Sequence, residues 1–141
     1  MTGKEFLKQI RDINITIISL QLEIERINTM LTSTTIRPKE VDVQTSGQSD
    51  PMADKVIKKV EYEDKLKEML GRQMDIKEQA LKLIDSLDRQ EDKSFLMLRY
   101  LNCMSYKQIM DKTEMSLAGI KKRLSEAEKR FNILFDSHIK P

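Results

Sequence analysis

The stretch SYKQIMDKTEMSLAGIKKRLSEA, residues Ser105–Ala127, decides the fold that we expect for the last third of this chain. Ser105 and Gln108 have the spacing of a capping box, which predicts the start of a helix. This helix must be short, because Ser116 is a second candidate N-cap and a longer helix is expected over Leu117–Phe135. A short helix, a tight turn and a longer helix form a helix-turn-helix.

The apolar residues of this stretch predict which side of the last helix is exposed. Four of them have the spacing of a core between the two helices: Ile109, Met115, Ile120 and Leu124. Once these are buried, the helical period turns five residues outward: Leu117, Ala118, Lys121, Lys122 and Ser125. From Ser116 to Ser125 the chain has three basic residues and no acidic residue, so the outward side can approach a polyanion.

The first turns of this last helix also have the features of an anion-binding end. Ala118 and Gly119 are small, so the free backbone amides can lie close to a phosphate. Lys121 and Lys122, one turn further in, can reach base edges or phosphates in a major groove. The 141 residues have a net charge of only +2, but the residues from Glu91 onward include ten basic and seven acidic side chains. Double-stranded DNA is therefore the predicted partner.

Two apolar stripes predict a pair of long helices before this region. Both stripes alternate spacings of four and three residues, which is the pattern of a coiled coil. The first comprises Phe6, Ile10, Ile13, Ile17, Leu20, Ile24, Ile27 and Leu31, and the second Tyr62, Leu66, Met69, Gln73, Ile76, Ala80, Leu83 and Leu87. Gln73 is a polar residue within the second stripe, where a buried polar group can fix register. The two stripes predict an antiparallel helical hairpin.

The predicted fold is therefore all-α, with two domains. Residues 1–90 are expected to form the coiled-coil hairpin, and residues 91–138 the helix-turn-helix domain. Residues 32–51 contain seven Ser or Thr, Pro38, Pro51 and Gly47, which is typical of a flexible linker. Apolar residues outside the stripes predict further helix packing or a homo-oligomer through the N-terminal helices: Ile15, Ile18, Leu22, Leu70, Met74, Leu81 and Ile84.

Enzyme, metal-binding and membrane functions find no support in the residue pattern. The chain has one cysteine, Cys103, and one histidine, His138, with no HExxH, Cys-x-x-Cys or phosphate-binding glycine loop. We therefore expect no catalytic residues, no metal and no cofactor. Without a signal peptide or about 18 continuous apolar residues, we expect a cytoplasmic protein.

The same C-terminal residues resemble region 4 of sigma-70-type factors, through Phe95–Leu101, Ser105–Ile109 and Ser116–Ala127. The whole chain resembles small phage and prophage sigma-like regulators of the ArpU/RinA type. In that family the last helix binds the promoter −35 element. On this basis the expected DNA-binding residues are Ser116, Leu117, Ala118, Lys121, Lys122, Ser125 and Lys107, with Arg123 and Lys129 nearer the DNA backbone.

Two residues depart from the sigma region 4 pattern. Met110 stands where the family has a small Ala, and Glu114 where it has Gly. Either Glu114 adopts a positive φ angle at some energetic cost or the turn is reshaped. The aromatic cluster of sigma region 2 has no counterpart in the N-terminal half, so a complete sigma factor is not expected.

Three functions follow from these observations. The first is a phage-type transcription regulator that reads promoter DNA, with the hairpin supplying either dimerisation or a contact with RNA polymerase. The second is a small terminase-like DNA-packaging component, which also couples a helix-turn-helix to a coiled coil. The third is a protein-interaction module whose basic helix binds an acidic partner.

Overall fold

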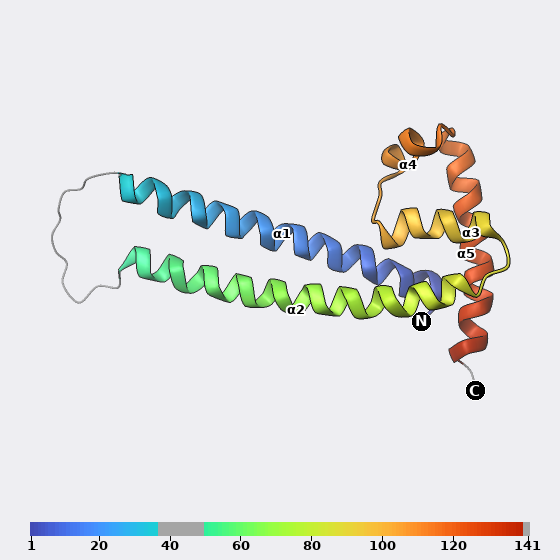
Figure 1. Ribbon diagram of the computed structural model, residues 1–141, viewed down its shortest axis with the longest axis horizontal. Coiled ribbons are helices and arrows are strands. Elements are labelled where there is room, and N and C mark those ends of the chain that lie inside the picture. Colours follow the sequence, from blue (N-terminus) through green and yellow to red (C-terminus); the bar gives the residue numbers. More distant parts are fainter. Residues whose placement is uncertain (37–49, 140–141) are drawn as a thin grey trace. The chain divides into compact units, whose positions relative to one another are not determined.

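The computed structural model describes residues 1–36 and 50–139, and these residues contain helices and no strand (Figure 1). The predicted all-α class is confirmed. In chain order the elements are α1 (Gly3–Ile36), α2 (Pro51–Asp85), α3 (Gln90–Leu96), the π-helical turn η1 (Met97–Leu101), α4 (Tyr106–Thr113) and α5 (Leu117–Ile139).

The predicted linker is helical at both of its ends. Residues 37–49 lie outside the described residues, but α1 continues to Ile36 and α2 already begins at Pro51. The expectation that the helix ends near Leu31 was wrong, since α1 continues to Ile36. The Thr29 and Thr32 hydroxyls donate hydrogen bonds to the carbonyls four residues earlier, at 3.0 and 2.9 Å, so these polar side chains are satisfied within the helix and do not end it. Pro51 fits the first helical position, where its missing N–H has no helical acceptor.

The chain packs as two compact units, residues 1–15 with 72–141 and residues 16–71. We call them the head unit and the hairpin unit. This grouping differs from the predicted domains 1–90 and 91–138, because the start of α1 and the end of α2 belong to the head unit. That the residues before and after position 90 have separate functions stays a prediction.

The hairpin unit contains two helical segments that lie side by side and run in opposite directions (Figure 1). Every stripe residue in this unit is buried or half-buried, which agrees with the predicted seam: Ile17, Leu20, Ile24, Ile27, Leu31, Tyr62, Leu66 and Met69. Ile18 and Leu22 lie outside the seam and are 47% and 60% exposed. The apolar residues predicted outside the stripe are thus exposed in this unit.

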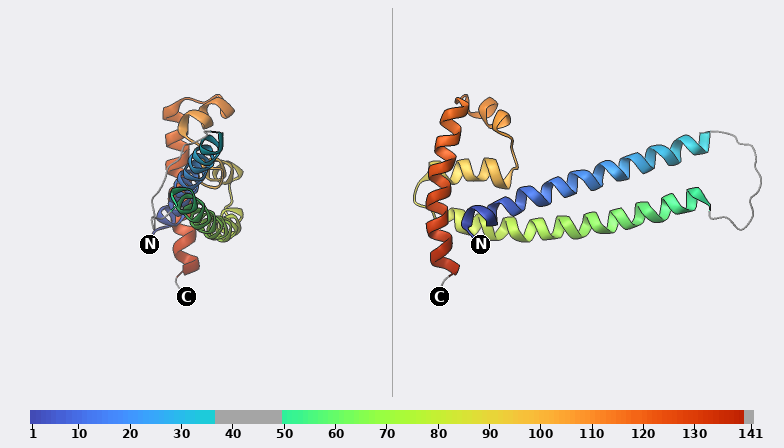
Figure 2. Two further views of the ribbon diagram at one scale, coloured as in Figure 1. Left: turned by 90° about the vertical axis from the view of Figure 1, so that its left-hand side faces the viewer. Right: turned by 180° about the vertical axis from the view of Figure 1, so that it is seen from behind.

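The head unit has one large core to which both long helices contribute. Its buried residues come from α1, α2, the turn after α2, α3, η1 and α5: Leu7, Ile10, Ala80, Ile84, Leu87, Leu96, Tyr100, Ala127, Phe131 and Phe135. Within this unit α3 packs against α5, and α4 packs against the start of α5 (Figure 2). Gln73 is buried as predicted, and its Nε2 donates to the Ile10 carbonyl at 3.2 Å and to Asn14 Oδ1 at 3.4 Å.

Gly3 lets α1 begin in direct contact with α5. A Cβ atom on Gly3 would lie 2.8 Å from the Phe131 ring and 2.8 Å from Asn132 Oδ1. The same Asn132 oxygen accepts a hydrogen bond from the Lys4 backbone amide at 2.7 Å, so it binds one of the free amides in the first turn of α1. Only a residue without a side chain fits there without displacing α5.

Candidate nucleic-acid interface

The first helix of the helix-turn-helix is fixed by its cap. Ser105 Oγ accepts from the Gln108 backbone amide at 3.2 Å, and Gln108 Oε1 accepts from the Ser105 backbone amide at 2.9 Å. Both halves of the predicted capping box are therefore present. The helix α4 then runs only to Thr113, as the second N-cap at Ser116 predicts.

The turn after α4 is closed by Glu114 in the left-handed conformation, with φ at 58°. Its backbone amide donates to the Met110 carbonyl at 2.8 Å, as in the usual C-cap in which glycine is favoured. The sequence left two possibilities for Glu114, a positive φ angle or a reshaped turn, and the structure has the positive φ angle. The helix-turn-helix geometry is retained with one residue in a costly conformation.

The second helix, α5, begins at Leu117 behind a serine cap. Ser116 Oγ accepts from the Gly119 amide at 3.1 Å, and the Ser116 carbonyl accepts from the Ile120 amide at 3.0 Å. The core between the two helices consists of Phe95, Ile109, Ile120 and Leu124, with half-buried Met115 and Met110 packed against it. The four predicted core residues thus lie together, and the larger Met110 fits at the edge of this core.

All nine residues predicted to bind DNA are exposed: Lys107, Ser116, Leu117, Ala118, Lys121, Lys122, Arg123, Ser125 and Lys129. They do not share one narrow face, because successive residues of an α-helix are about 100° apart. Ala118, Lys122, Ser125 and Lys129 occupy the middle of the exposed side. Lys121 lies on one flank of the helix, where its Nζ is 5.5 Å from the centre of the Tyr106 ring.

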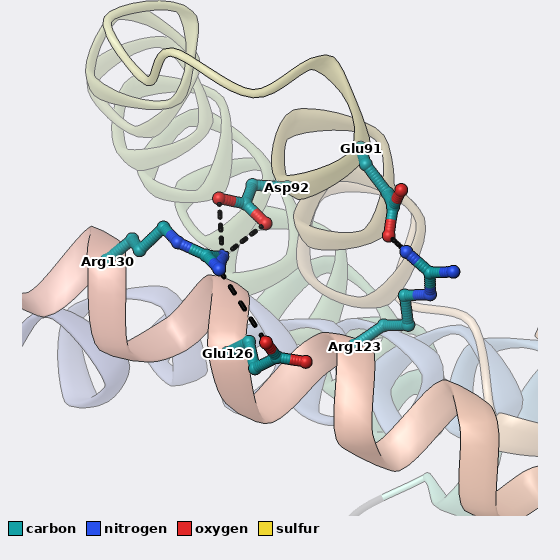
Figure 3. A network of polar contacts seen from close by, with 5 residues as sticks. All are labelled: Glu91, Asp92, Arg123, Glu126 and Arg130. Atoms are coloured by element: carbon teal, nitrogen blue, oxygen red, sulfur yellow. Dashed lines mark hydrogen bonds and ion pairs between the residues drawn. The ribbon is translucent and has the colours of Figure 1, made fainter.

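Arg123 lies on the opposite flank of α5 and forms an ion pair with Glu91 of α3 (Figure 3). Both side chains are about half exposed, at 47% and 48%, so this pair adds little stability. The pairing partly neutralises Arg123, and its position differs from that of Lys121 and Lys122. The exposed positive charge of the first turns of α5 is thus concentrated on the two lysines.

A second ion pair holds α3 against α5. Arg130 Nη1 donates to both carboxylate oxygens of Asp92, at 3.0 and 3.1 Å, and Arg130 Nη2 lies 3.7 Å from Glu126 (Figure 3). The Asp92 side chain is only 7% exposed, whereas that of Arg130 is 32% exposed. This pair is not predictable from the sequence, because residues so far apart in the chain carry no local spacing signal.

The thiol of Cys103 is half-buried. Burial raises the pKa of the Cys103 thiol above its usual value, and its Sγ donates to the Tyr100 carbonyl at 3.4 Å. Within residues 1–36 and 50–139, no three His, Cys, Asp or Glu side chains are grouped so that they could hold a metal ion. None of the helices described there combines the length and the apolar character needed to cross a membrane.

A family model described as "Protein of unknown function (DUF1492)" matches residues 30–132, which is most of the chain. The chain belongs to this family. DUF1492 is a phage-type family, and the matched residues include α3, η1, α4 and α5 up to residue 132. Searches of curated proteins and of solved structures gave no match.

Proposed function

We propose that this DUF1492 protein is a DNA-binding transcription regulator that reads promoter DNA with α5. One observation carries the proposal. The stretch from Ser116 to Ser125 contains no acidic residue, lies at the start of the second helix of a helix-turn-helix, and is exposed at its lysines. In known helix-turn-helix proteins, the start of this helix contacts base edges in the major groove.

The packing of α5 supports this orientation. Ile120 and Leu124 are buried against α4, so the exposed side of the helix faces away from the protein core. The Ser116 cap leaves the other first-turn amides and the small Ala118 at the surface, where an anion is favoured. A phosphate beside this end and bases beside Lys122 and Ser125 form the contact that we infer.

The sigma region 4 resemblance supports a more specific role. We propose that the target is a promoter element and that the hairpin unit provides self-association or contacts RNA polymerase. The exposed Ile18 and Leu22 of the hairpin unit suit such a protein contact.

The test is a salt series of DNA-binding measurements by fluorescence anisotropy, on a duplex selected from a random pool with the parent protein. Lys121→Ala with Lys122→Ala is expected to weaken binding and to make the negative slope of log affinity against log salt shallower, by about 0.9 for each of the two lysines that contacts a phosphate. The matched control is Lys58→Ala with Lys59→Ala, an adjacent lysine pair in α2.

The control pair is expected to bind as the parent does. An unchanged slope in the α5 variant, or an equal loss in the control, would show that α5 is not the recognition helix. Failure of the parent to select or bind any duplex at low salt would refute the DNA-binding function.

A further inference from the structure

A basic cleft lies beside α5 within the head unit. It has a volume of about 540 Å³ and is lined by residues of α1, η1, α4 and α5, among them Lys4, Lys8, Arg11, Arg99, Lys121 and Glu128. Five cationic side chains and one carboxylate line it. Three of the cations come from the first turns of α1, which sequence analysis assigned to the coiled coil alone.

Contacts at the start of α1 place its basic residues at this cleft. Lys4, Lys8 and Arg11 are spaced by four and three residues, so they share one side of the helix. The close approach at Gly3 and the bond from the Lys4 amide to Asn132 fix the start of α1 against α5. The lysines are therefore held on the head unit next to the recognition helix.

Two arginines form an ordered part of the cleft wall. Arg11 Nη1 donates to the carbonyls of Arg99 and Met104 at 2.8 and 3.0 Å, and Arg99 Nη1 donates to the Met104 carbonyl at 3.0 Å. The Arg99 guanidinium also lies 4.0 Å from the centre of the Tyr106 ring. These bonds use Nη1 of each guanidinium, and a guanidinium carries five N–H donors, so each arginine can also donate to an anion.

The single carboxylate of the cleft is already engaged by protein groups. Glu128 Oε2 accepts from the Tyr100 hydroxyl at 2.5 Å, and Oε1 lies 3.5 Å from Lys4 Nζ. Burial of Tyr100 and this hydrogen bond to Glu128 raise the pKa of the phenol well above its usual range, so Tyr100 remains a donor. Both carboxylate oxygens of Glu128 therefore interact with protein groups, Oε2 with the Tyr100 hydroxyl and Oε1 with Lys4 Nζ.

We propose that this cleft binds a phosphate of the DNA backbone when α5 lies in the major groove. The inference rests on the proposed function, and it adds α1 to the DNA-binding surface. Lys121 and Ser125 belong both to the exposed side of α5 and to the cleft lining, so DNA against that side brings its backbone to the cleft. The phosphates carry the negative charge of DNA, and arginine and lysine side chains donate hydrogen bonds to them.

The test uses Lys8→Gln in the full chain, because Lys8 is exposed and lies outside the helix-turn-helix. Losing one phosphate contact is expected to make the negative slope of log affinity against log salt shallower by about 0.9. If both proteins bind equally at 1 M salt, this slope makes the variant about eightfold weaker at 0.1 M. Lys82→Gln, an exposed lysine of α2 that does not line the cleft, is the matched control and is expected to bind as the parent does.

A methylphosphonate scan of the duplex identifies the contacted phosphate. The parent is expected to lose affinity when one particular phosphate is made neutral, and Lys8→Gln is expected to be insensitive at that position. If the neutral phosphate weakens binding by the same factor in Lys8→Gln as in the parent, Lys8 does not contact that phosphate. This result would overturn the proposal. Thermal unfolding checks that the variant is folded.

Two further outcomes separate this inference from the proposed function. If Lys121→Ala with Lys122→Ala weakens DNA binding while Lys8→Gln has no effect, α5 remains the recognition helix and the cleft inference is wrong. If inorganic phosphate binds in a Lys8-dependent manner while DNA binding is independent of Lys8, the cleft is a site for free phosphate and the backbone proposal is again overturned. A parent that binds no DNA refutes both.

Discussion

Removal of Arg130 is expected to destabilise the head unit, because it would leave the Asp92 carboxylate buried without its cationic partner. Asp92 is 7% exposed at its side chain, and both of its oxygens accept from Arg130 Nη1. Breaking a fully buried pair costs about 3–5 kcal/mol. Since the Arg130 side chain is 32% exposed and water can partly replace it, we expect about 2–3 kcal/mol for Arg130→Met.

Chemical unfolding followed by circular dichroism measures this loss, and thermal unfolding should show a midpoint about 5–10 °C lower. The double variant Asp92→Leu with Arg130→Met removes both charges, so it should recover most of the stability. Glu91→Gln, which removes the exposed pair with Arg123, serves as the control and should change stability by less than about 0.5 kcal/mol. A double variant as unstable as Arg130→Met would refute the reasoning, because it would show that lost packing and not the unpaired carboxylate causes the effect.

Three further predictions concern backbone strain, close packing and the polar seam residue. Glu114→Gly should stabilise the protein by about 1 kcal/mol in urea unfolding, because Gly adopts a positive φ freely; Glu114→Ala should give no such gain. Gly3→Ala should destabilise it by about 1–3 kcal/mol by overpacking against Phe131 and Asn132, and a melting temperature equal to the parent's would contradict the close contact. Gln73→Leu should raise stability by about 1 kcal/mol, since the polar group is buried in an apolar seam; a lower urea midpoint would show that its bonds to Ile10 and Asn14 matter more.

The local features of this chain could be predicted from short spacings. The two apolar stripes predicted long helices with buried seams, because a repeat of four and three residues places side chains on one side of a helix. The Ser105–Gln108 capping box predicted the start of α4, and the second N-cap at Ser116 predicted that α4 is short, because caps depend on bonds between residues a few positions apart. The exposed side of α5 followed from the same period.

The surroundings of α5 depended on contacts between distant residues. The basic spacing of Lys4, Lys8 and Arg11 is visible in the sequence, yet it identifies only one side of a helix. Its place beside Lys121 follows from the close approach at Gly3, which sequence spacing does not indicate. The sequence alone determined the two long helices apart from the end of α1, the caps of α4 and α5, and the helix-turn-helix. Only the tertiary structure joined the two ends of the chain around one basic cleft, because that depends on packing between side chains far apart in sequence.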